Sequence, residues 1–505
     1  MEPAKTAIEL KGITKRFGAV VANDHIDLSV RQGEILALLG ENGSGKTTLM
    51  NMLSGIYRPD SGSIFIGGQA AVIRSPEDAA RHKIGMIHQH FKLVEVHTAA
   101  DNILLGSKKE SWLLGKNRGG RIRELCDAYG LEIDPGKRVY DMSVSEKQTV
   151  EILKVLYRGA DILILDEPTA VLTPQETDKL FGILRRMKER GCAVIIITHK
   201  LNEVLAISDR VTILRKGQSV ATVKTADTDA RQLTELMVGR PVTLSIERPE
   251  PEKREKLLEI HRLTVLNGEG LEALRDVSFS LDEGEILGVA GVAGSGQKEL
   301  CETIAGLQKV KEGAILYKKE NIVGKTPREI IKKGISMSFI PEDRLGMGLA
   351  ASMGMVDNML LKSYLNGRGP FVRRREAREL ARRLIGQLDI VTPGVDTPVR
   401  RLSGGNVQKV LLGREIESNP HVLITAYAVR GLDIHSSYMI YDALNAQKKK
   451  GVGILFIGED LDVMLELCDR ILVLCHGRVT GVVDAKGTTK EQLGLMMTGA
   501  GQEGG

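Results

Sequence analysis

One short stretch of the sequence combines glycines, a lysine and a hydroxyl group at a spacing that suits phosphate chemistry. Residues Gly40–Thr47 read GENGSGKT, fit the pattern GxxxxGK[ST], follow an apolar run and precede a helical pattern. In such a loop backbone N–H groups turn inward around phosphate oxygens, and the helix N-terminus adds positive potential. We expect Lys46 to reach the β- and γ-phosphates of a nucleotide and the Thr47 hydroxyl to hold Mg²⁺.

Other polar side chains follow strand-length apolar runs further along the chain. Asp166 and Glu167 come directly after one such run, where Asp166 would bind Mg²⁺ through water and Glu167 would polarise the attacking water. Gln89 ends another predicted strand and could sense the metal and the γ-phosphate. His199 ends a third and could contact the γ-phosphate, although a histidine by itself is more often a core or surface residue. Two acids at a strand end can likewise simply face solvent, so these assignments depend on the glycine-rich loop.

The elements that must position these residues occur twice in the chain. Gln32–Gly40 reads QGEILALLG and Glu283–Gly291 reads EGEILGVAG, and later motifs recur in the same order with small insertions. Each copy alternates buried-strand runs such as Leu36–Leu39 with helix-length amphipathic stretches, which is typical of an α/β fold with a largely parallel sheet. The stretches from about 101 to 159 and from about 357 to 418 are expected to be helical inserts in that core.

Composition narrows the class of protein. A chain of 505 residues with 42% hydrophobic and 27% charged residues predicts about two to four globular domains. The net charge of +5 is too mild to argue for nucleic-acid binding. No apolar run approaches the roughly 18–20 residues of a membrane helix, and the N-terminus lacks the apolar segment of a signal peptide. The five cysteines lack metal-ligand spacing and predict reduced core thiols, so we expect a soluble intracellular protein that reaches a membrane only through partners.

The order of the motifs resembles the ATP-binding cassette of ABC transporters. Two copies of this cassette together cover nearly the whole chain. The family's signature LSGGQ appears in the second half as LSGGN at Leu402–Asn406. The resemblance implies an α/β fold of two tandem P-loop NTPase domains, each with a helical subdomain, with ATP and Mg²⁺ as cofactors. Cassettes of this family close head-to-tail, so that each ATP lies between one P-loop and the signature of the other cassette.

The resemblance assigns roles to particular positions of this sequence. The implied catalytic residues are Lys46, Gln89, Glu167 and His199. The implied metal-binding residues are Thr47, Gln89 and Asp166. The implied ATP-binding residues, with an aromatic side chain to stack on adenine, are Phe17, Gly40, Glu41, Asn42, Gly43, Ser44, Gly45, Lys46, Thr47, Thr48, Ser403, Gly404 and Gly405.

The two halves retain these motifs unequally. The second P-loop, Gly291–Lys298, reads GVAGSGQK, so that Gln297 replaces the lysine and Lys298 the metal-binding hydroxyl. Other second-half positions also depart from the family pattern, namely Glu342, Ala426, Tyr427, Glu459 and, near the aromatic position, Val265 and Leu266. The first signature reads MSVSE at Met142–Glu146, which adds Cβ atoms where backbone must approach phosphate. Head-to-tail pairing would put both degraded motifs in one site, so we expect one hydrolytic and one non-hydrolytic site.

Fused cassettes with a degenerate second half resemble the ATPases of bacterial simple-sugar and nucleoside importers. The expected domains are residues 1–243 and 257–505, joined by a linker at 244–256. The stretches GMIHQHF at 85–91 and EDLD at 459–462 favour the nucleoside branch. The same role in a simple-sugar importer (ribose, galactose or xylose) is the alternative, and a soluble twin-cassette ATPase acting on ribosomes is the alternative of another class.

Such an importer implies particular partners. The chain would bind transmembrane permease subunits at the cytoplasmic face of the cell membrane, would depend indirectly on an extracytoplasmic substrate-binding protein, and would bind no nucleic acid. Permeases would dock on the helical inserts, where a methionine cluster suits either a partner helix or core packing: Met347, Met353, Met355 and Met359. Two basic runs suit either anionic lipid or a solvated helix face: Lys108, Lys109, Lys116, Arg118 and Arg121, and Arg373, Arg374, Arg375, Arg378, Arg382 and Arg383.

Overall fold

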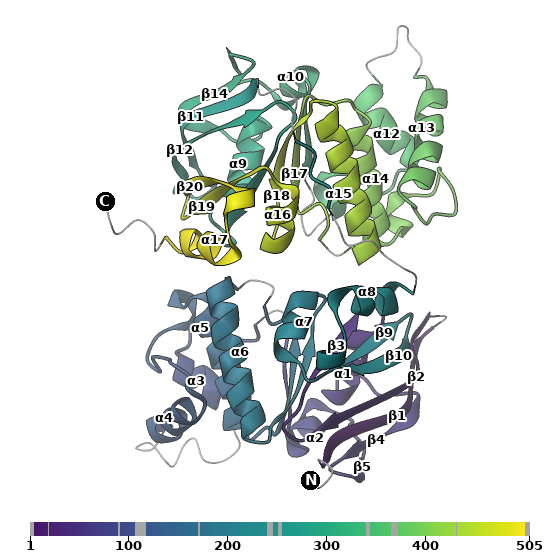
Figure 1. The fold of residues 1–505 in the computed structure, drawn as a ribbon, viewed down its shortest axis with the longest axis vertical. Helices are drawn as coiled ribbons and strands as arrows, with labels where there is room; N and C mark the ends of the chain where they lie inside the picture. The colour runs from purple at the N-terminus through teal and green to yellow at the C-terminus, as the bar shows by residue number, and fades with distance from the viewer. Residues whose placement is uncertain are drawn as a thin grey trace. The chain divides into compact units, whose positions relative to one another are not determined.

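The computed structural model divides the chain into two compact units, Met1–Thr243 and Leu244–Gly505 (Figure 1). The residues that it describes are 5–18, 20–88, 91–106, 118–169, 172–239, 246–250, 255–339, 344–364, 372–430 and 432–499.

The first unit is built on a six-stranded sheet in the order β10-β9-β3-β8-β7-β6, which is parallel except for the antiparallel strand β10. Its strands are β3 (Ile35–Gly40), β6 (Ile84–Ile87), β7 (Ile162–Asp166), β8 (Ala193–Ile197), β9 (Arg210–Arg215) and β10 (Gln218–Lys224). Every residue of β3, β7 and β8 is buried, as expected for aliphatic strands covered on both faces. The expectation of buried parallel strands at these three positions is confirmed.

A second, antiparallel sheet of the first unit has the order β2-β1-β4-β5. Its strands are β1 (Thr6–Phe17), β2 (Val20–Arg31), β4 (Ser61–Ile66) and β5 (Gln69–Ala71). The helices of this unit are α1 (Lys46–Leu53), α2 (Pro76–Arg81), α3 (Ala99–Leu104), α4 (Arg118–Tyr129), α5 (Val144–Tyr157), α6 (Pro174–Glu189), α7 (Leu201–Ile207) and α8 (Ala230–Val238). Helices α3, α4 and α5 gather at one end of the unit, which confirms the predicted helical insert (Figure 1).

The second unit repeats this architecture. Its main sheet has the order β16-β17-β18-β13-β19-β20, and its antiparallel sheet has the order β12-β11-β14-β15. The strands are β11 (Lys256–Leu266), β12 (Glu272–Asp282), β13 (Ile286–Gly291), β14 (Val310–Tyr317), β15 (Glu320–Asn321), β16 (Ile335–Phe339), β17 (Val422–Ala426), β18 (Gly453–Ile457), β19 (Arg470–Cys475) and β20 (Arg478–Asp484). The helices are α9 (Gln297–Ile304), α10 (Pro327–Lys332), α11 (Arg344–Met347), α12 (Met355–Ser363), α13 (Arg374–Gln387), α14 (Gly404–Ile416), α15 (Ile434–Lys449), α16 (Leu461–Leu467) and α17 (Lys490–Met497).

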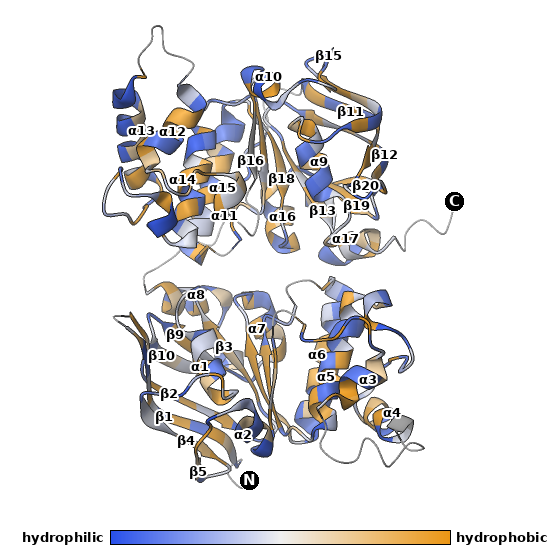
Figure 2. Ribbon diagram, turned by 180° about the vertical axis from the view of Figure 1, so that it is seen from behind, coloured by the Kyte–Doolittle hydropathy of each residue, from blue (hydrophilic) through white to orange (hydrophobic). Residues whose placement is uncertain are grey.

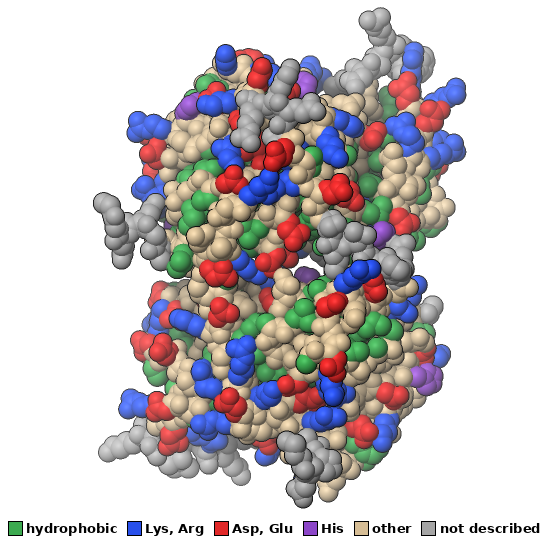
Figure 3. Space-filling model, in the orientation of Figure 1, with side chains coloured by type: hydrophobic (Ala, Val, Ile, Leu, Met, Phe, Trp, Pro, Cys, Tyr) green, Lys and Arg blue, Asp and Glu red, His purple; other side chains and the backbone are tan. Residues whose placement is uncertain are grey.

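The apolar cores lie between the sheets and the helices of each unit. The strands of both main sheets are largely hydrophobic, whereas the helices carry their polar residues on one side (Figure 2). Charged side chains of both signs are dispersed over the visible surface of each unit (Figure 3). The five cysteines are free thiols, four buried and Cys126 partly buried. None of the helices in the described part of the chain is long and apolar enough to cross a bilayer.

The segment between the two copies contacts the second unit. Arg248 donates hydrogen bonds from Nη1 to the carbonyls of Leu465 and Cys468, near the C-terminus of α16. Asn445 of α15 donates from Nδ2 to the Glu247 carbonyl at 2.7 Å. Residues 246–250 are therefore held on the surface of the second unit.

The structure distinguishes between the two interpretations of the methionine cluster and of the basic run in the second unit. Met355 and Met359 are buried in the core, whereas Met347 and Met353 are 57% and 43% exposed. Four arginines of α13 and its vicinity pair with carboxylates within the unit: Arg374 with Asp357, Arg375 with Glu379, Arg378 with Asp396 and Arg383 with Glu417. The basic run of the first unit lies largely outside the described residues. The second-unit run is thus mostly a charge-balanced helix face.

Candidate functional site

The candidate site of the first unit forms at the carboxyl ends of three adjacent strands, β3, β8 and β7. Strand β3 ends at Gly40 and leads into the first P-loop, and β7 ends at Asp166. Strand β8 ends at Ile197, and His199 follows two residues later. Carboxyl ends of neighbouring parallel strands are the usual place for ligands in open α/β sheets. The sheet therefore brings together Lys46, Asp166, Glu167 and His199, as the motifs predict.

The first P-loop has a backbone shape that requires glycine at two positions. Gly45 precedes α1 with a φ of 97°, and a Cβ atom there would lie 2.3 Å from the Ala22 carbonyl oxygen. A Cβ atom on Gly40 would lie 2.3 Å from the Leu214 carbonyl oxygen. Ser44 is buried in this loop, and its Oγ has no hydrogen-bond partner among the described residues. The loop thus holds an unsatisfied polar group at the N-terminus of α1, which suits an anionic ligand.

Lys46 lies at the start of α1 and is 7% exposed. Its Nζ donates to the carbonyls of Gly40 at 2.6 Å and Glu41 at 3.0 Å. Burial lowers the pKa of Lys46, and the negative charges of Glu167 and Asp166 oppose this shift. Among the described residues the ammonium is desolvated and donates to carbonyl oxygens, and a phosphate oxygen would be a stronger partner.

Asp166, the last residue of β7, is 9% exposed. Its burial and the adjacent charge of Glu167 raise its pKa to about 6, although Lys46 acts in the opposite direction. A buried carboxylate whose ionised form is disfavoured is suited to binding a cation, because the cation would stabilise its negative charge. The Asp166 carboxylate is therefore suited to binding a divalent cation beside the P-loop.

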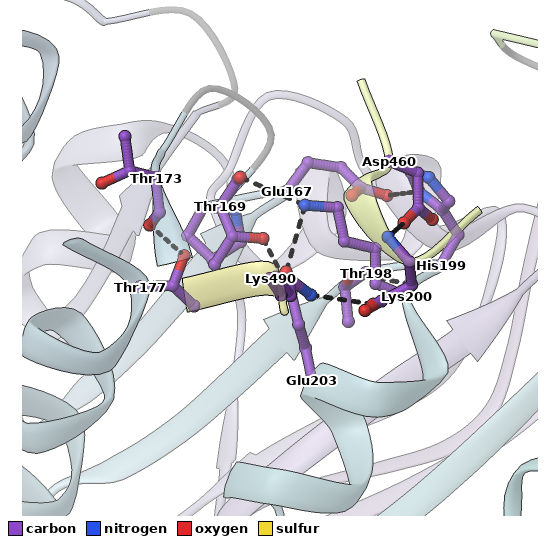
Figure 4. Close-up of polar contacts among 12 residues, drawn as sticks. Glu167, Thr169, Thr173, Thr177, Thr198, His199, Lys200, Glu203, Asp460 and Lys490 are labelled. Carbon is purple, nitrogen blue, oxygen red and sulfur yellow. Dashed lines mark hydrogen bonds and ion pairs between the residues drawn. The ribbon is translucent and has the colours of Figure 1, made fainter. Parts of the chain in front are cut away.

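Glu167 adopts a left-handed backbone conformation with a φ of 48°. Its backbone N–H donates to the Ile197 carbonyl at 2.9 Å, and its Oε1 lies 2.9 Å from Nδ1 of His199 (Figure 4). Oε2 is buried and has no hydrogen-bond partner in the described part of the chain. A non-glycine residue in this region costs roughly 1–2 kcal/mol, which the surrounding contacts must offset. One carboxylate oxygen is thus oriented by histidine while the other is left free to accept a proton.

The contact with Glu167 raises the pKa of His199. Desolvation lowers the pKa of His199, but the hydrogen bond and the negative charge of Glu167 outweigh this effect, and the pKa is raised. The side chain remains 59% exposed.

Gln89, the remaining predicted catalytic and metal-binding residue, lies outside the described residues.

Phe17, the predicted adenine-stacking residue, is 44% exposed at the end of β1. Its ring packs edge-to-face against Tyr57 with centroids 5.2 Å apart, and Lys15 Nζ lies 5.5 Å from its centroid. Asp60 holds this end of the strand, because it accepts from the Lys15 ammonium and from the Arg16 backbone N–H. Sequence reasoning missed Tyr57 and Asp60, since only the pairing of β1 with β4 brings them to Phe17.

The second unit retains the backbone of this site but not its side chains. Gly296 has a φ of 102°, close to that of Gly45, but Gln297 replaces the lysine and donates to the Val292 carbonyl at 3.2 Å. Tyr427 occupies the position of Glu167 with a φ of 55°, and its N–H donates to the Ile457 carbonyl at 2.8 Å. The second-unit counterpart of His199 is Glu459, which pairs with Arg430 at 3.5 Å. At the positions that match Lys46, Thr47 and Glu167, this unit therefore has Gln297, Lys298 and Tyr427.

The two signatures also differ in local structure. Ser143 caps α5 in a capping box with Glu146, whose carboxylate accepts from the Ser143 N–H and from Lys137. Ser403 caps α14, and the matching residue Asn406 donates from Nδ2 to its Oγ at 2.8 Å. A carboxylate at the N-terminus of α5 opposes a bound phosphate, whereas the N-terminus of α14 has a neutral amide. Gly404 and Gly405 form the first turn of α14.

Together the fold and the site of the first unit define an ATP-binding P-loop NTPase. The sequence model of the family described as ABC transporter matches residues 23–170 and 274–425, one match in each unit. The chain belongs to this family and is an ATPase.

Three curated relatives align with nearly the whole chain. The nucleoside import ATP-binding protein NupA of Lactococcus lactis is 41% identical, with 98% of each chain covered. The guanosine import ATP-binding protein NupO of Bacillus subtilis is 43% identical, also with 98% of each covered. The glucose import ATP-binding protein TsgD13 of Haloferax volcanii is 40% identical, with 98% of this chain and 96% of the relative covered.

One solved structure shares the fold over nearly the whole chain at low sequence identity. It is the archaeal ribosome recycling factor aABCE1 in complex with the ribosomal stalk protein aP1, at 19% identity and a TM-score of 0.61. The match covers 94% of this chain and 90% of that one. At this identity the likeness shows the fold alone.

Proposed function

We propose that this chain is the ATP-hydrolysing subunit of an importer, with a nucleoside as cargo and one hydrolytic site. The observation that carries the hydrolytic part is the edge of the first-unit sheet, where one oxygen of Glu167 is held by His199 and the other has no hydrogen-bond partner among the described residues. The observation that carries the importer part is the 41–43% identity to the nucleoside and guanosine import proteins over 98% of the chain.

Each residue of the first-unit site contributes one chemical role to hydrolysis. Lys46 supplies a desolvated positive charge to the phosphates. Glu167 Oε2 accepts a proton from the attacking water, while His199 orients the same carboxylate through Oε1. Phe17, supported by Tyr57, offers an exposed ring face to the adenine.

The donor set beside the P-loop suits a magnesium ion. Thr47, Asp166 and Gln89 would hold Mg²⁺, which supplies positive charge to the phosphate oxygens when bound. Asp166 fits this role because its buried carboxylate ionises only at a cost that a cation would remove.

The family resemblance supports a contribution from the second unit to this site. Ser403, Gly404 and Gly405 would add hydrogen-bond donors to the phosphates of the ATP held by the first P-loop. The second P-loop and the first signature would form the non-hydrolytic site, because Gln297 replaces the lysine there and Glu146 adds a negative charge. The units would correspond to domains 1–243 and 257–505.

The importer role requires other subunits, because the described part of this chain holds no membrane-spanning helix. Permease subunits would bind the helical subdomains and place the chain at the cytoplasmic face of the membrane. An extracytoplasmic binding protein would act indirectly, through the permeases, and no nucleic acid would take part. The exposed side chains of Met347 and Met353 are available for such a contact.

Two alternatives differ in cargo or class. The 40% identity to the glucose import protein supports a simple-sugar importer almost as well as a nucleoside importer. The ribosome-acting class has only a shared fold to support it.

The cargo test uses the chain assembled with the permeases and binding protein encoded beside it, in liposomes. The proposal predicts that binding protein loaded with guanosine or adenosine stimulates ATP hydrolysis, whereas ribose or glucose does not. Stimulation by sugars alone would move the assignment to the sugar branch. Failure to assemble with any permease, combined with stimulation by ribosomes, would overturn the importer role.

A further inference from the structure

Three polar side chains of the first unit form a closed ring next to the catalytic pair. Thr169 Oγ1 donates to Glu203 Oε2 at 2.5 Å, and Lys200 Nζ donates to the Thr169 carbonyl at 3.2 Å. Lys200 Nζ also lies 3.1 Å from Glu203 Oε1, which closes the ring (Figure 4). Thr169 is 1% exposed, and the side chains of Lys200 and Glu203 are 28% and 13% exposed. The ring is therefore mostly shielded from water, where its hydrogen bonds are strong.

The ring joins the two segments that carry the catalytic pair. Thr169 follows Glu167 by two residues, and Lys200 directly follows His199. Glu203 lies in the first turn of α7, the helix that begins after His199. A relative displacement of these two segments would change the Glu167–His199 distance of 2.9 Å.

Other hydrogen bonds that hold the turn after β7 have counterparts after β17 in the second unit. In each, the left-handed residue after the strand donates its N–H to the neighbouring strand, from Glu167 to Ile197 and from Tyr427 to Ile457. A buried glutamine of the signature helix also binds a carbonyl of the turn in each unit. These bonds run from Gln148 to the Pro168 carbonyl at 2.9 Å and from Gln408 to the Arg430 carbonyl at 2.8 Å. The shared bonds fix the backbone of the turn whether or not a catalytic pair is present.

The ring, in contrast, is absent from the described residues of the second unit. The positions that match Thr169, Lys200 and Glu203 are Val429, Asp460 and Val463. Asp460 instead caps α16 by accepting from the N–H groups of Asp462 and Val463. The second unit forms the same turn and the same helix without the ring. The ring is therefore not required for folding and accompanies the Glu167–His199 pair.

We propose that Thr169, Lys200 and Glu203 are positioning residues that hold Glu167 and His199 in the geometry needed for attack by water on ATP. The inference rests on the proposed hydrolytic role of Glu167 and His199. Tyr427 has the same left-handed backbone as Glu167 without a ring, so the ring would act on the relative position of the Glu167 and His199 side chains and not on the backbone of the turn. A displacement of a reacting group by about 1 Å can reduce a rate by up to roughly a hundredfold. None of the three ring residues needs to contact the nucleotide for this effect.

The test replaces ring residues by those of the second unit, in the full-length chain. Thr169→Val and Glu203→Val are each expected to lower kcat for ATP about 10- to 100-fold with KM unchanged, because the P-loop is untouched. The double variant should be no worse than the worse single variant, since either change opens the ring. Thr169→Ser keeps the hydroxyl and should restore most of kcat. Glu203→Gln keeps an acceptor for Thr169 and should fall between wild type and Glu203→Val.

Thr173→Val provides the matched structural control. Thr173 is also a buried threonine of this segment, but it caps α6 instead of joining the ring. Its loss should lower the melting temperature and leave kcat unchanged. Ring variants with wild-type kcat, or with additive losses that follow their melting temperatures, would overturn the positioning role. Glu167→Gln and Lys46→Ala are measured in the same assay. If both variants retain ATP turnover, the proposed hydrolytic site is wrong. If these two variants lose turnover and the ring variants do not, only the positioning role of the ring is wrong.

Discussion

At the scale of single residues, two adjacent carboxylates in the first unit have opposite environments. Asp166 is enclosed at the end of β7, and its pKa is raised to about 6 by burial and by the charge of Glu167. Glu167 instead has one oxygen hydrogen-bonded to His199, and its other oxygen has no partner in the part of the chain that the structure describes. The first arrangement suits a ligand for a cation and the second suits a proton acceptor. The buried charge of Asp166 costs folding free energy in the absence of a ligand, and Glu167 is the proton acceptor in the proposed hydrolysis.

The first prediction concerns the cost of the Asp166 charge. A carboxyl group whose pKa is raised on folding destabilises the folded protein as pH rises from about 4 through 6. Asp166→Asn should therefore increase the stability of the nucleotide-free chain at pH 7.5, by on the order of 1–3 kcal/mol. Thermal denaturation across a pH series would measure this, at roughly 2–4 °C per kcal/mol.

The pH series also provides the control for this prediction. The gain from Asp166→Asn should shrink as pH falls toward 4, where the wild-type carboxyl is protonated in both states. Equal gains at pH 4 and pH 7.5 would mean that the substitution acts through packing and not through the buried charge.

The sequence predicted the identity of these residues, because P-loop and strand-end motifs are local. It could not show that Glu167 takes a left-handed backbone or that one of its oxygens contacts His199, since both depend on β8 and the segment that follows it. It also missed Tyr57, Thr169 and Glu203, whose partners are far away in the sequence. A residue comparison between the two halves held a signal for Thr169 and Glu203, because valines stand at both matching positions.

At the scale of elements, the N-termini of α5 and α14 differ in charge although both helices begin with a serine cap. The first turn of α5 includes Glu146, which forms a capping box and binds Lys137. The first turn of α14 contains glycines and Asn406. Only α14 therefore presents N–H groups and a helix dipole without a competing carboxylate.

The second prediction compares the two caps. Ser143→Ala and Ser403→Ala should each cost about 1 kcal/mol of stability, because both remove a helix cap. ATP hydrolysis should fall strongly only for Ser403→Ala, since its serine is proposed to serve the hydrolytic site. Steady-state ATPase rates and melting temperatures of both variants would check this. A larger loss of activity in Ser143→Ala would mean that the signatures are assigned to the wrong P-loops.

Element positions could be read from the sequence where one periodicity dominates. Continuous aliphatic runs predicted β3, β7 and β8, because strands buried on both faces need no polar side. The methionine cluster could not be assigned to the core or to the surface from the sequence. Met355 and Met359 of α12 face the core, whereas Met347 and Met353 do not. Their burial depends on packing against α13 and α14, which local spacing does not encode.

At the scale of the whole molecule, one fold is repeated, and only the first copy has the residues to which we assign hydrolysis. The sheet orders of the two units are the same, and the left-handed turn after the strand occurs in both. The differences are confined to side chains such as Lys46 and Gln297, or Glu167 and Tyr427. We therefore expect the second unit to contribute mainly its shape and the first unit to hydrolyse ATP.

The comparison of Lys46→Ala with Gln297→Ala tests the central claim most directly. Both substitutions truncate the matching buried side chain of a P-loop, so their structural costs are similar. We expect Lys46→Ala to lower the ATPase rate by at least about a hundredfold, because a buried cation at the phosphates is lost. Gln297→Ala should keep most of the wild-type rate. Equal losses in the two variants would contradict an account in which a single P-loop hydrolyses ATP.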